Sequence, residues 1–363
     1  MQKLSHWIMP VLGLAMLWSG SCKPAKAPDP VVITPDSVAR DTAMAVNPDE
    51  VLAASARFGS GYVFADSALK VITGTFRQAN DFIGSPVTMS YTFVAPEMDT
   101  MQYRPFVLMV HEGAFLFGDQ VNELGKARYL ARKGYAVACI NYRLGFNGGS
   151  EANPCGGNTM EVVQAVYRAV QDTYAALHFF AGKSEAYGID RGQMILAGSS
   201  AGAITVSALA YMKEIDFESL QTGIINTLGR LDPDPNGKAF SVRALLTYLG
   251  YGVFKTSYIK PDNVKPTVFF QRTGDDILPY EKGNLFFCPF YLTSEGARPV
   301  SQELKKLAVP YELNFQPETG HQLSYSNEYV ANRYAMFMKR LWGKDYRQLT
   351  IRNYTTQEDL VLP

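Results

Sequence analysis

Short hydrophobic runs alternate with amphipathic stretches over most of the chain, from about residue 65 to residue 342. The continuous apolar run at 106–110 is typical of a parallel strand that is buried on both faces. The stretch 159–181 places Val162, Val166 and Val170 on one helical face, which predicts a long amphipathic helix. Regular alternation of this kind predicts an α/β fold with a doubly wound, mostly parallel sheet.

The same patterns predict the other elements and two interruptions. We expect an edge hairpin from the first two strands, with helices between the later ones. The expected strands are 69–73, 87–94, 135–141, 194–197, 242–249, 267–271 and 311–315, and the expected helices are 122–133, 201–212, 301–307 and 327–342. Residues 213–240, with Pro233, Pro235 and several charges, interrupt the alternation and are expected to form a small insertion or lid. Residues 346–363 are expected to be a polar C-terminal tail, which leaves 61–345 as the main domain.

The first 60 residues indicate export. Lys3 precedes a short apolar stretch at 7–18, and the small residues at 19–21 lead to Cys22. This resembles a bacterial lipoprotein signal peptide (1–21), after which Cys22 would carry lipid, although Ser19 stands where an aliphatic residue is usual. Cleavage without lipidation remains the alternative. The Pro-rich segment 22–60 is expected to be a tether, so we expect an exported protein of the bacterial cell envelope whose contact with the membrane is a lipid anchor only.

Composition excludes several other classes. The 363 residues are 47% hydrophobic and 12% aromatic, enough for a large buried core. Lys plus Arg and Asp plus Glu both number 34, and no basic run occurs, so nothing indicates a nucleic acid or an anionic lipid surface as a partner.

The strongest chemical motif is Gly198-Ser199-Ser200-Ala201-Gly202, which matches G-x-S-x-G. It lies between an expected strand at 194–197 and an expected helix at 201–212, as a nucleophile elbow requires. Ser199 does not fit the role, because alanines occupy its two glycine offsets. A chance turn of small residues is the alternative, but the flanking strand and helix make Ser200 the candidate nucleophile.

Several segments, together with this elbow, resemble the carboxylesterase-like and lipase-like branch of the α/β-hydrolase family over roughly residues 65–342. They are Asn-Tyr-Arg-Leu-Gly-Phe at 141–146, Ala-Val-Gln-Asp-Thr-Tyr-Ala-Ala-Leu at 169–177, and Tyr-Gly-Ile-Asp at 187–190. The resemblance implies the α/β-hydrolase fold and a catalytic Ser-His-Asp triad. It implies mostly structural roles for the segments at 141–146 and around Asp172.

The base and the acid follow from the order serine, acid, histidine along such chains. Of the four histidines, His6 lies in the signal segment, His111 precedes Ser200, and His178 lies mid-helix. His321, in the loop after the strand at 311–315, is therefore the candidate base.

The acid should follow the strand at 267–271, where Asp275 and Asp276 compete. Asp275 precedes Pro279 by four residues, which resembles the family's G-(x)-D-x-x-V-P arrangement. Asp275 is therefore favoured, and Asp276 is left to cap the following turn.

The oxyanion donors are implied by the segment 111–115, His-Glu-Gly-Ala-Phe, which resembles the H-G-G-x-F motif of the family. By position, the donors are the backbone N–H groups of Gly113, Ala114 and Ala201. Glu112 stands where the family usually has glycine, and a carboxylate beside an anion site is unhelpful unless it points away. A plain strand-to-loop turn is the alternative.

These residues together predict a serine hydrolase that cleaves carboxylic esters through an acyl-enzyme, with no cofactor and no metal. The substrate would be a small-molecule ester or an acyl group on a polysaccharide. A lipase or peptidase of the same fold is the enzymatic alternative, although a peptidase would usually carry a further large domain and a lipase an apolar lid. A catalytically silent, ligand-binding lipoprotein is the alternative from another class.

The remaining cysteines differ in their surroundings. Cys139 lies in an apolar run and is expected to be a buried thiol, whereas Cys155 and Cys288 lie in loop-like, Pro/Gly-containing sequence. Both loops would leave the carboxyl end of the sheet, so an exported protein could bridge them, with two separate thiols as the alternative. No Cys or His spacing indicates a metal site.

Overall fold

The structure is a computed structural model that describes residues 47–353 and 360–362. Its strands are β1 (Leu69–Asn80), β2 (Pro86–Pro96), β3 (Arg104–Val110), β4 (Ala136–Ile140), β5 (Ile189–Ser199), β6 (Val242–Tyr248), β7 (Thr267–Gly274), β8 (Lys282–Asn284), β9 (Thr293–Glu295), β10 (Tyr311–Thr319), β11 (Gln348–Arg352) and β12 (Leu360–Leu362). Its α-helices are α1 (Pro48–Ala54), α2 (Leu124–Arg132), α3 (Thr159–Gly182), α4 (Ser184–Tyr187), α5 (Ala201–Tyr211), α6 (Glu214–Leu220), α7 (Ile224–Leu228), α8 (Ala297–Lys306) and α9 (Asn327–Trp342). Short 3₁₀ turns are η1 (Asp66–Ala68), η2 (Gln120–Glu123), η3 (Thr256–Tyr258) and η4 (Leu285–Phe287).

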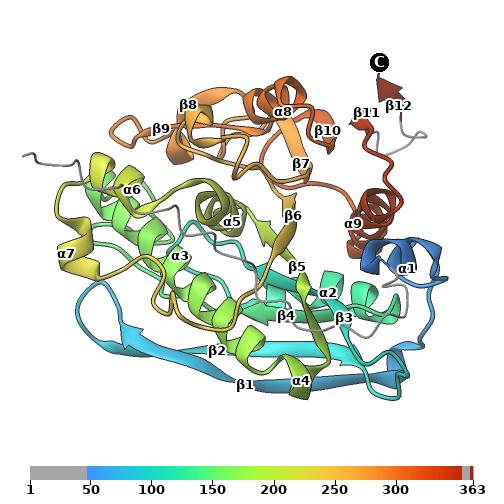
Figure 1. Cartoon of the computed structure of the whole chain (residues 1–363). Coiled ribbons are helices and arrows are strands. Elements are labelled where there is room, and N and C mark those ends of the chain that lie inside the picture. Colours follow the sequence, from blue (N-terminus) through green and yellow to red (C-terminus); the bar gives the residue numbers. More distant parts are fainter. Residues whose placement is uncertain (1–46, 354–359, 363) are drawn as a thin grey trace, which may run out of the picture. The chain divides into compact units, whose positions relative to one another are not determined.

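Ten of the described strands form one sheet in the order β1-β2-β4-β3-β5-β6-β7-β10-β11-β12. The pairs between consecutive strands of the series β4-β3-β5-β6-β7-β10-β11 are parallel, and the pairs β1–β2, β2–β4 and β11–β12 at the two ends are antiparallel. The reversal of strand order at β3 and β4 means that helices cross on both faces (Figure 1). The predicted α/β-hydrolase fold is confirmed.

Alternate residues of the central strands enter two separate hydrophobic cores. Along β3, Phe106, Leu108 and Val110 pack in one core, and Val107 and Met109 pack in the other. This period of two is the expected result of a pleated strand that is covered on both sides. Helices α3, α5 and α8 supply the first core, and α1, α2 and α9 supply the second (Figure 1).

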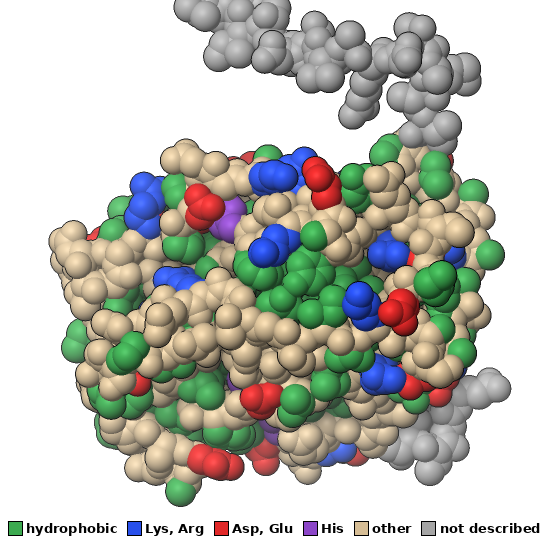
Figure 2. Space-filling view, turned by 90° about the horizontal axis from the view of Figure 1, so that it is seen from below, with side chains coloured by type: hydrophobic (Ala, Val, Ile, Leu, Met, Phe, Trp, Pro, Cys, Tyr) green, Lys and Arg blue, Asp and Glu red, His purple; other side chains and the backbone are tan. Residues whose placement is uncertain are grey.

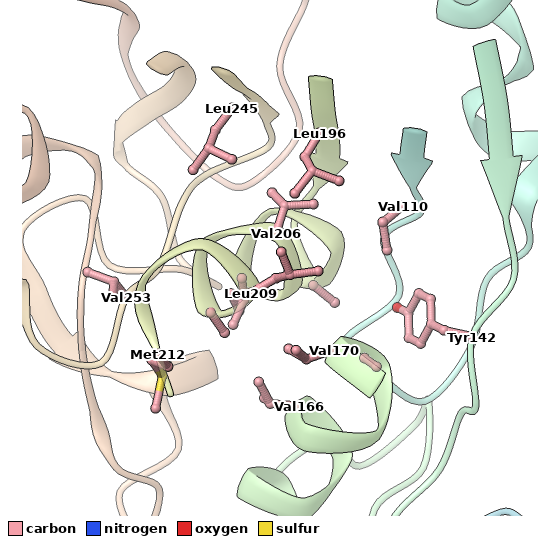
Figure 3. Close-up of a cluster of buried hydrophobic side chains, with 14 of the residues drawn as sticks. Val110, Tyr142, Val166, Val170, Leu196, Val206, Leu209, Met212, Leu245 and Val253 are labelled. Carbon is pink, nitrogen blue, oxygen red and sulfur yellow. The ribbon is translucent and has the colours of Figure 1, made fainter. Parts of the chain in front are cut away.

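The buried helix α5 holds the elbow against the sheet. Each of its residues is apolar, small or hydroxylated, and all but Ala210 are buried. Figure 3 shows Val206 and Leu209 of α5 in the same cluster as Leu196 of β5 and Val166 and Val170 of α3. Because α5 is packed on every side, the first turn of the helix is fixed relative to the carboxyl end of β5.

The edge strand β1 is only partly buried, and its register with β2 shifts between Thr75 and Arg77. Bulges and charged side chains on an edge discourage pairing with another chain. On the face seen in Figure 2, basic and acidic side chains lie beside one another with hydrophobic ones between them. That face therefore carries no field of a single sign, in line with the balanced composition.

The structure corrects both expected ends of the main domain. Helix α1 starts at Pro48, and Leu52 and Phe58 are buried in the core of α2 and α9, so the folded part begins before residue 61. Burial of these two apolar side chains stabilises the folded segment, which its proline content alone would not predict. At the other end, β11 and β12 extend the sheet, so part of the expected tail is structural.

Residues 213–240 form α6, α7 and a loop, and Phe217, Ile224 and Leu231 join the core around α3. None of these residues lines the pocket described below. The expected signal peptide and Cys22 lie outside the described residues. Within the described part of the chain, no helix is both long and apolar enough to span a bilayer.

Candidate active site

The candidate catalytic residues lie at the carboxyl ends of neighbouring strands. Ser200 follows β5, Asp275 follows β7, and His321 follows β10 by two residues. The loop that contains Gly113 follows β3. In a parallel sheet these ends share one edge, so residues far apart in sequence meet there.

Two close backbone approaches determine the shape of the elbow. Ser200 has φ 49° and ψ −112°, and its N–H donates to the Tyr248 carbonyl at 2.8 Å. A Cβ on Gly198 would lie 2.3 Å from the Gly202 carbonyl oxygen, and one on Gly202 would lie 2.0 Å from the Val110 carbonyl oxygen. Only glycine fits at these two positions. The strain at Ser200 costs on the order of 1–3 kcal/mol and is held in place by the packed strand and helix.

The three predicted residues form one chain of hydrogen bonds. His321 Nε2 lies 3.0 Å from Ser200 Oγ, and His321 Nδ1 lies 3.0 Å from both carboxylate oxygens of Asp275. Ser200 and Asp275 are buried, and the His321 side chain is 13% exposed. The candidate nucleophile, base and orienting acid are thus within hydrogen-bond distance of one another in a site that is largely buried.

Asp275, and not Asp276, faces the histidine. Its Oδ1 also accepts hydrogen bonds from the N–H groups of Ile277 and Leu278, both at 2.9 Å. Asp276 is exposed. The expectation that Asp276 caps the following turn was wrong, because Asp275 caps the turn and orients His321 with the same carboxylate.

Three consecutive residues of the loop after β3 have positive φ. Gly113, Ala114 and Phe115 have φ values of 116°, 52° and 64°, and the Gly113 carbonyl accepts from the N–H groups of Leu116 and Phe117. A Cβ on Gly113 would lie 1.9 Å from the Phe117 carbonyl oxygen. Ala201, at the first turn of α5, likewise has no acceptor within its helix for its N–H. Gly113, Ala114 and Ser200 all line one pocket, so two of the three residues predicted as oxyanion donors lie in the same pocket as the candidate nucleophile.

That pocket has a volume of about 240 Å³ and mostly apolar walls. Its lining residues are Glu112, Gly113, Ala114, Phe117, Glu151, Pro154, Ser200, Leu249, Ile277, Phe286, His321 and Gln322. The apolar wall residues were not identified from the sequence. Leu249 and Ile277 follow the ends of β6 and β7. They could have been predicted, because ligands in open α/β sheets bind at the carboxyl ends of the strands. Phe286 and Pro154 come from long loops for which no local pattern exists.

Cys155 and Cys288 are joined by a disulfide, with their Cα atoms 5.3 Å apart. The bridge links the loop that contains Pro154 to the loop that contains Phe286. Tyr291 reinforces it, because its hydroxyl donates to the Pro154 carbonyl at 2.6 Å and accepts from the Gly157 N–H at 3.2 Å. Two walls of the pocket are therefore held together by one covalent bond and two hydrogen bonds. The Cys139 thiol is buried and free.

A buried ion pair lies behind the elbow. The Lys126 ammonium is 3.0 Å from Glu123, donates to Ser199 Oγ at 3.3 Å, and lies 4.7 Å from the centroid of the Tyr248 ring. Ser199 directly precedes Ser200, and the Tyr248 carbonyl accepts a hydrogen bond from the Ser200 N–H. This pair was not predicted, and its only sequence signal is a Glu and a Lys three residues apart, at the end of η2 and in α2.

The other residues singled out from the sequence lie apart from this chain of hydrogen bonds. His111 is fully buried and stacks on Tyr142 with ring centroids 4.5 Å apart, and burial lowers its pKa. His178 of α3 pairs with Asp232 at 2.9 Å, and its side chain is mostly buried. Arg143 donates to the buried Asp172 at 2.9 Å and so anchors the segment after β4. Among the described residues, no group of three or more His, Cys, Asp or Glu side chains could hold a metal ion.

Comparison with known proteins finds similarity to hydrolases and esterases. A family model described as BD-FAE matches residues 93–256, which include Ser200 and the loop after β3 but not Asp275 or His321. A probable N-octanoylanthranilate hydrolase from Rhodococcus erythropolis is 30% identical over 126 residues. That segment is 34% of this chain and 26% of the relative, so the match spans about a quarter of the relative's length.

Solved structures extend the likeness to most of the chain. Thermogutta terrifontis esterase 2 phosphoramylated by tabun matches with a TM-score of 0.51 and 12% identity, over 78% of this chain and 97% of that one. The apo form of the same esterase matches with a TM-score of 0.50, 12% identity and the same coverage. At this identity the likeness establishes the fold alone.

Proposed function

We propose that this protein is a serine hydrolase that cleaves carboxylic esters through an acyl-enzyme. The observation that carries the proposal is the hydrogen-bonded chain from Ser200 through His321 to Asp275, with both hydrogen bonds at 3.0 Å, at one end of an apolar pocket. The similarity to a named hydrolase and to esterase folds supports it. A ligand-binding protein without activity would have no need for the strained serine.

The reaction follows from the positions of these groups. Asp275 accepts a hydrogen bond from His321 Nδ1, which turns the Nε2 lone pair toward Ser200. Ser200 Oγ attacks the ester carbonyl carbon as its proton passes to His321 Nε2. The negative charge that develops on the carbonyl oxygen is stabilised by the N–H groups of Gly113, Ala114 and Ala201.

The same groups carry out the collapse of the first tetrahedral intermediate and the hydrolysis of the acyl-enzyme. His321 returns its proton to the leaving alcohol as the carbon–oxygen bond breaks, which leaves the acyl group on Ser200. A water molecule then gives a proton to His321 and attacks the acyl carbon. Collapse of this second intermediate releases the acid and restores the Ser200 hydroxyl.

The size of the pocket favours short substrates. A volume of about 240 Å³ is below the roughly 300–1,000 Å³ that is typical of pockets for drug-sized ligands. We infer that short acyl groups, on a small-molecule alcohol or on a polysaccharide, are preferred to long ones. Residues 213–240 do not cover the pocket, which disfavours a lipase. The N-octanoylanthranilate of the named relative is a useful second substrate to test.

Labelling with a fluorophosphonate probe tests the proposal. The expected result is one covalent adduct on the intact protein, which mass spectrometry locates on Ser200. The Ser199→Ala variant should still label and the Ser200→Ala variant should not. Absence of any adduct on the folded wild type would favour the silent binding protein. A panel of p-nitrophenyl esters from acetate to octanoate then tests the short-chain preference.

We propose further that the protein is exported and held to the membrane through lipid on Cys22. Only the sequence of residues 1–22 supports this part. A multiply acylated cysteine would be needed, since a single acyl chain anchors a protein marginally. The Cys22→Ser variant should leave the membrane fraction or accumulate unprocessed. A wild-type mature chain that is unlipidated and begins elsewhere would contradict the idea.

A further inference from the structure

The charged side chains that line the pocket, other than the catalytic groups, are both carboxylates. Glu112 follows β3 on one side, and Glu151 lies in the exposed loop that precedes α3. No Lys or Arg is among the described residues that line the pocket. The pocket is therefore acidic, although the chain as a whole has no net charge.

No basic side chain neutralises Glu112 by contact. Its Oε1 accepts a hydrogen bond from Asn122 Nδ2 at 2.9 Å, and within residues 47–353 no Lys or Arg lies within ion-pair distance of it. Lys126 is near, but it is paired with Glu123 at 3.0 Å. Glu112 thus adds a carboxyl group without a direct basic partner to the pocket lining, and it precedes Gly113, one of the proposed oxyanion donors.

That charge opposes catalysis on a neutral ester. Negative charge develops on the carbonyl oxygen in the transition state, and a carboxylate in the lining of the same pocket raises the energy of that state. A positive charge on the substrate would remove the penalty. The aromatic rings of Phe117 and Phe286 line the same pocket, and the faces of such rings attract cations.

We propose that the pocket selects esters that carry a cationic group of the quaternary ammonium class. In this proposal the Glu112 carboxylate attracts the cation and so determines the preference. The proposal rests on the ester hydrolase activity proposed above. It predicts that kcat/KM falls in the order cationic, neutral, anionic for substrates of the same shape. Glu151, which is exposed to solvent, contributes less because water screens it.

Isosteric esters isolate the charge from the shape. Acetylcholine and 3,3-dimethylbutyl acetate share their shape and differ in one positive charge on the alcohol, and 4-acetoxybutanoate adds an anionic alcohol. Ethyl betaine ester and ethyl 3,3-dimethylbutanoate place the charge difference on the acyl side, with each kcat/KM divided by the rate constant of alkaline hydrolysis of that ester because the ammonium group also activates the carbonyl. The quantity to compare is the ratio of kcat/KM between the members of a pair, for wild type, Glu112→Gln, Glu151→Gln and the remote surface control Glu185→Gln.

The expected result is a preference of about tenfold for the cation in at least one pair, as one close opposite charge supplies. Glu112→Gln should abolish most of that preference and raise kcat on the neutral ester, and Glu185→Gln should keep the wild-type ratio. An unchanged ratio in Glu112→Gln, or no preference in either pair, would overturn the proposal. Failure of the ester hydrolase proposal would look different, since no ester would turn over and no fluorophosphonate adduct would form.

Discussion

The elbow and the pocket walls are built in opposite ways. The elbow occupies five consecutive residues, and its shape follows from two glycines that cannot carry a Cβ at 2.3 Å and 2.0 Å from backbone oxygen. The walls come from loops more than a hundred residues apart, which meet through a disulfide of sequence separation 133. Local backbone constraints therefore determine where the chemistry happens, and long-range contacts determine what enters. Variants of the elbow should abolish turnover, and variants of the walls should alter selectivity or stability.

After substitution of Ser200, the largest loss of kcat is expected from substitution of Asp275. This loss distinguishes Asp275 from Asp276. Asp275→Asn should lower kcat by about 10⁴-fold, because the amide favours the wrong tautomer of His321. Asp276→Asn should change kcat little, since Asp276 is exposed and does not contact His321. Steady-state kinetics on a short ester decides the ranking. The reverse order would move the acid to Asp276.

A smaller catalytic loss is expected at the loop after β3. Gly113→Ala places a Cβ 1.9 Å from the Phe117 carbonyl oxygen, so the loop and its N–H donors must move. We expect kcat to fall by about 10²–10³-fold. Gly182→Ala is the matched control, because nothing lies within 4 Å of its added Cβ. Equal kinetics in the two variants would exclude the loop from the oxyanion site.

Removal of the disulfide should affect stability more than chemistry. The double variant Cys155→Ser/Cys288→Ser should lose about 2–5 kcal/mol of unfolding free energy, as expected for a bridge that closes a long loop. The two walls should also become mobile, which would raise KM more than it lowers kcat. Urea unfolding and thiol counting are the measurements. Detection of Cys155 and Cys288 as free thiols in the denatured, unreduced wild type would refute the bridge.

The smallest effect concerns Glu112, whose pKa is raised by burial and then by the nearby Glu123. An acid with a raised pKa in the folded state stabilises the fold at low pH and loses that contribution as the pH rises through the raised pKa. The gain in Tm of Glu112→Gln over wild type should therefore grow from pH 4 toward pH 8. Glu112→Ala should show the same trend if the charge is responsible. A Tm difference that is independent of pH would contradict this.

The same contrast explains what could be predicted from the sequence. Hydrophobic periodicity located β3, β5 and α3, and the local G-x-S-x-G motif singled out Ser200. Asp275 and His321 followed from the order of serine, acid and histidine along chains of the family that this sequence resembles. The buried Leu52 and Phe58 gave no such signal, and the expected tether therefore extended too far. The position of Phe286 in the pocket and the pairing of Lys126 behind the elbow depend on tertiary contacts, which no local pattern contains.

The central claim is that Ser200 is the nucleophile of an ester hydrolase. The most direct test is kcat/KM on p-nitrophenyl acetate for wild type, Ser200→Ala and the adjacent Ser199→Ala, each shown to be folded by circular dichroism. The account predicts a loss of about 10³–10⁶-fold for Ser200→Ala and a far smaller loss for Ser199→Ala. Turnover by Ser200→Ala close to that of the wild type would contradict it.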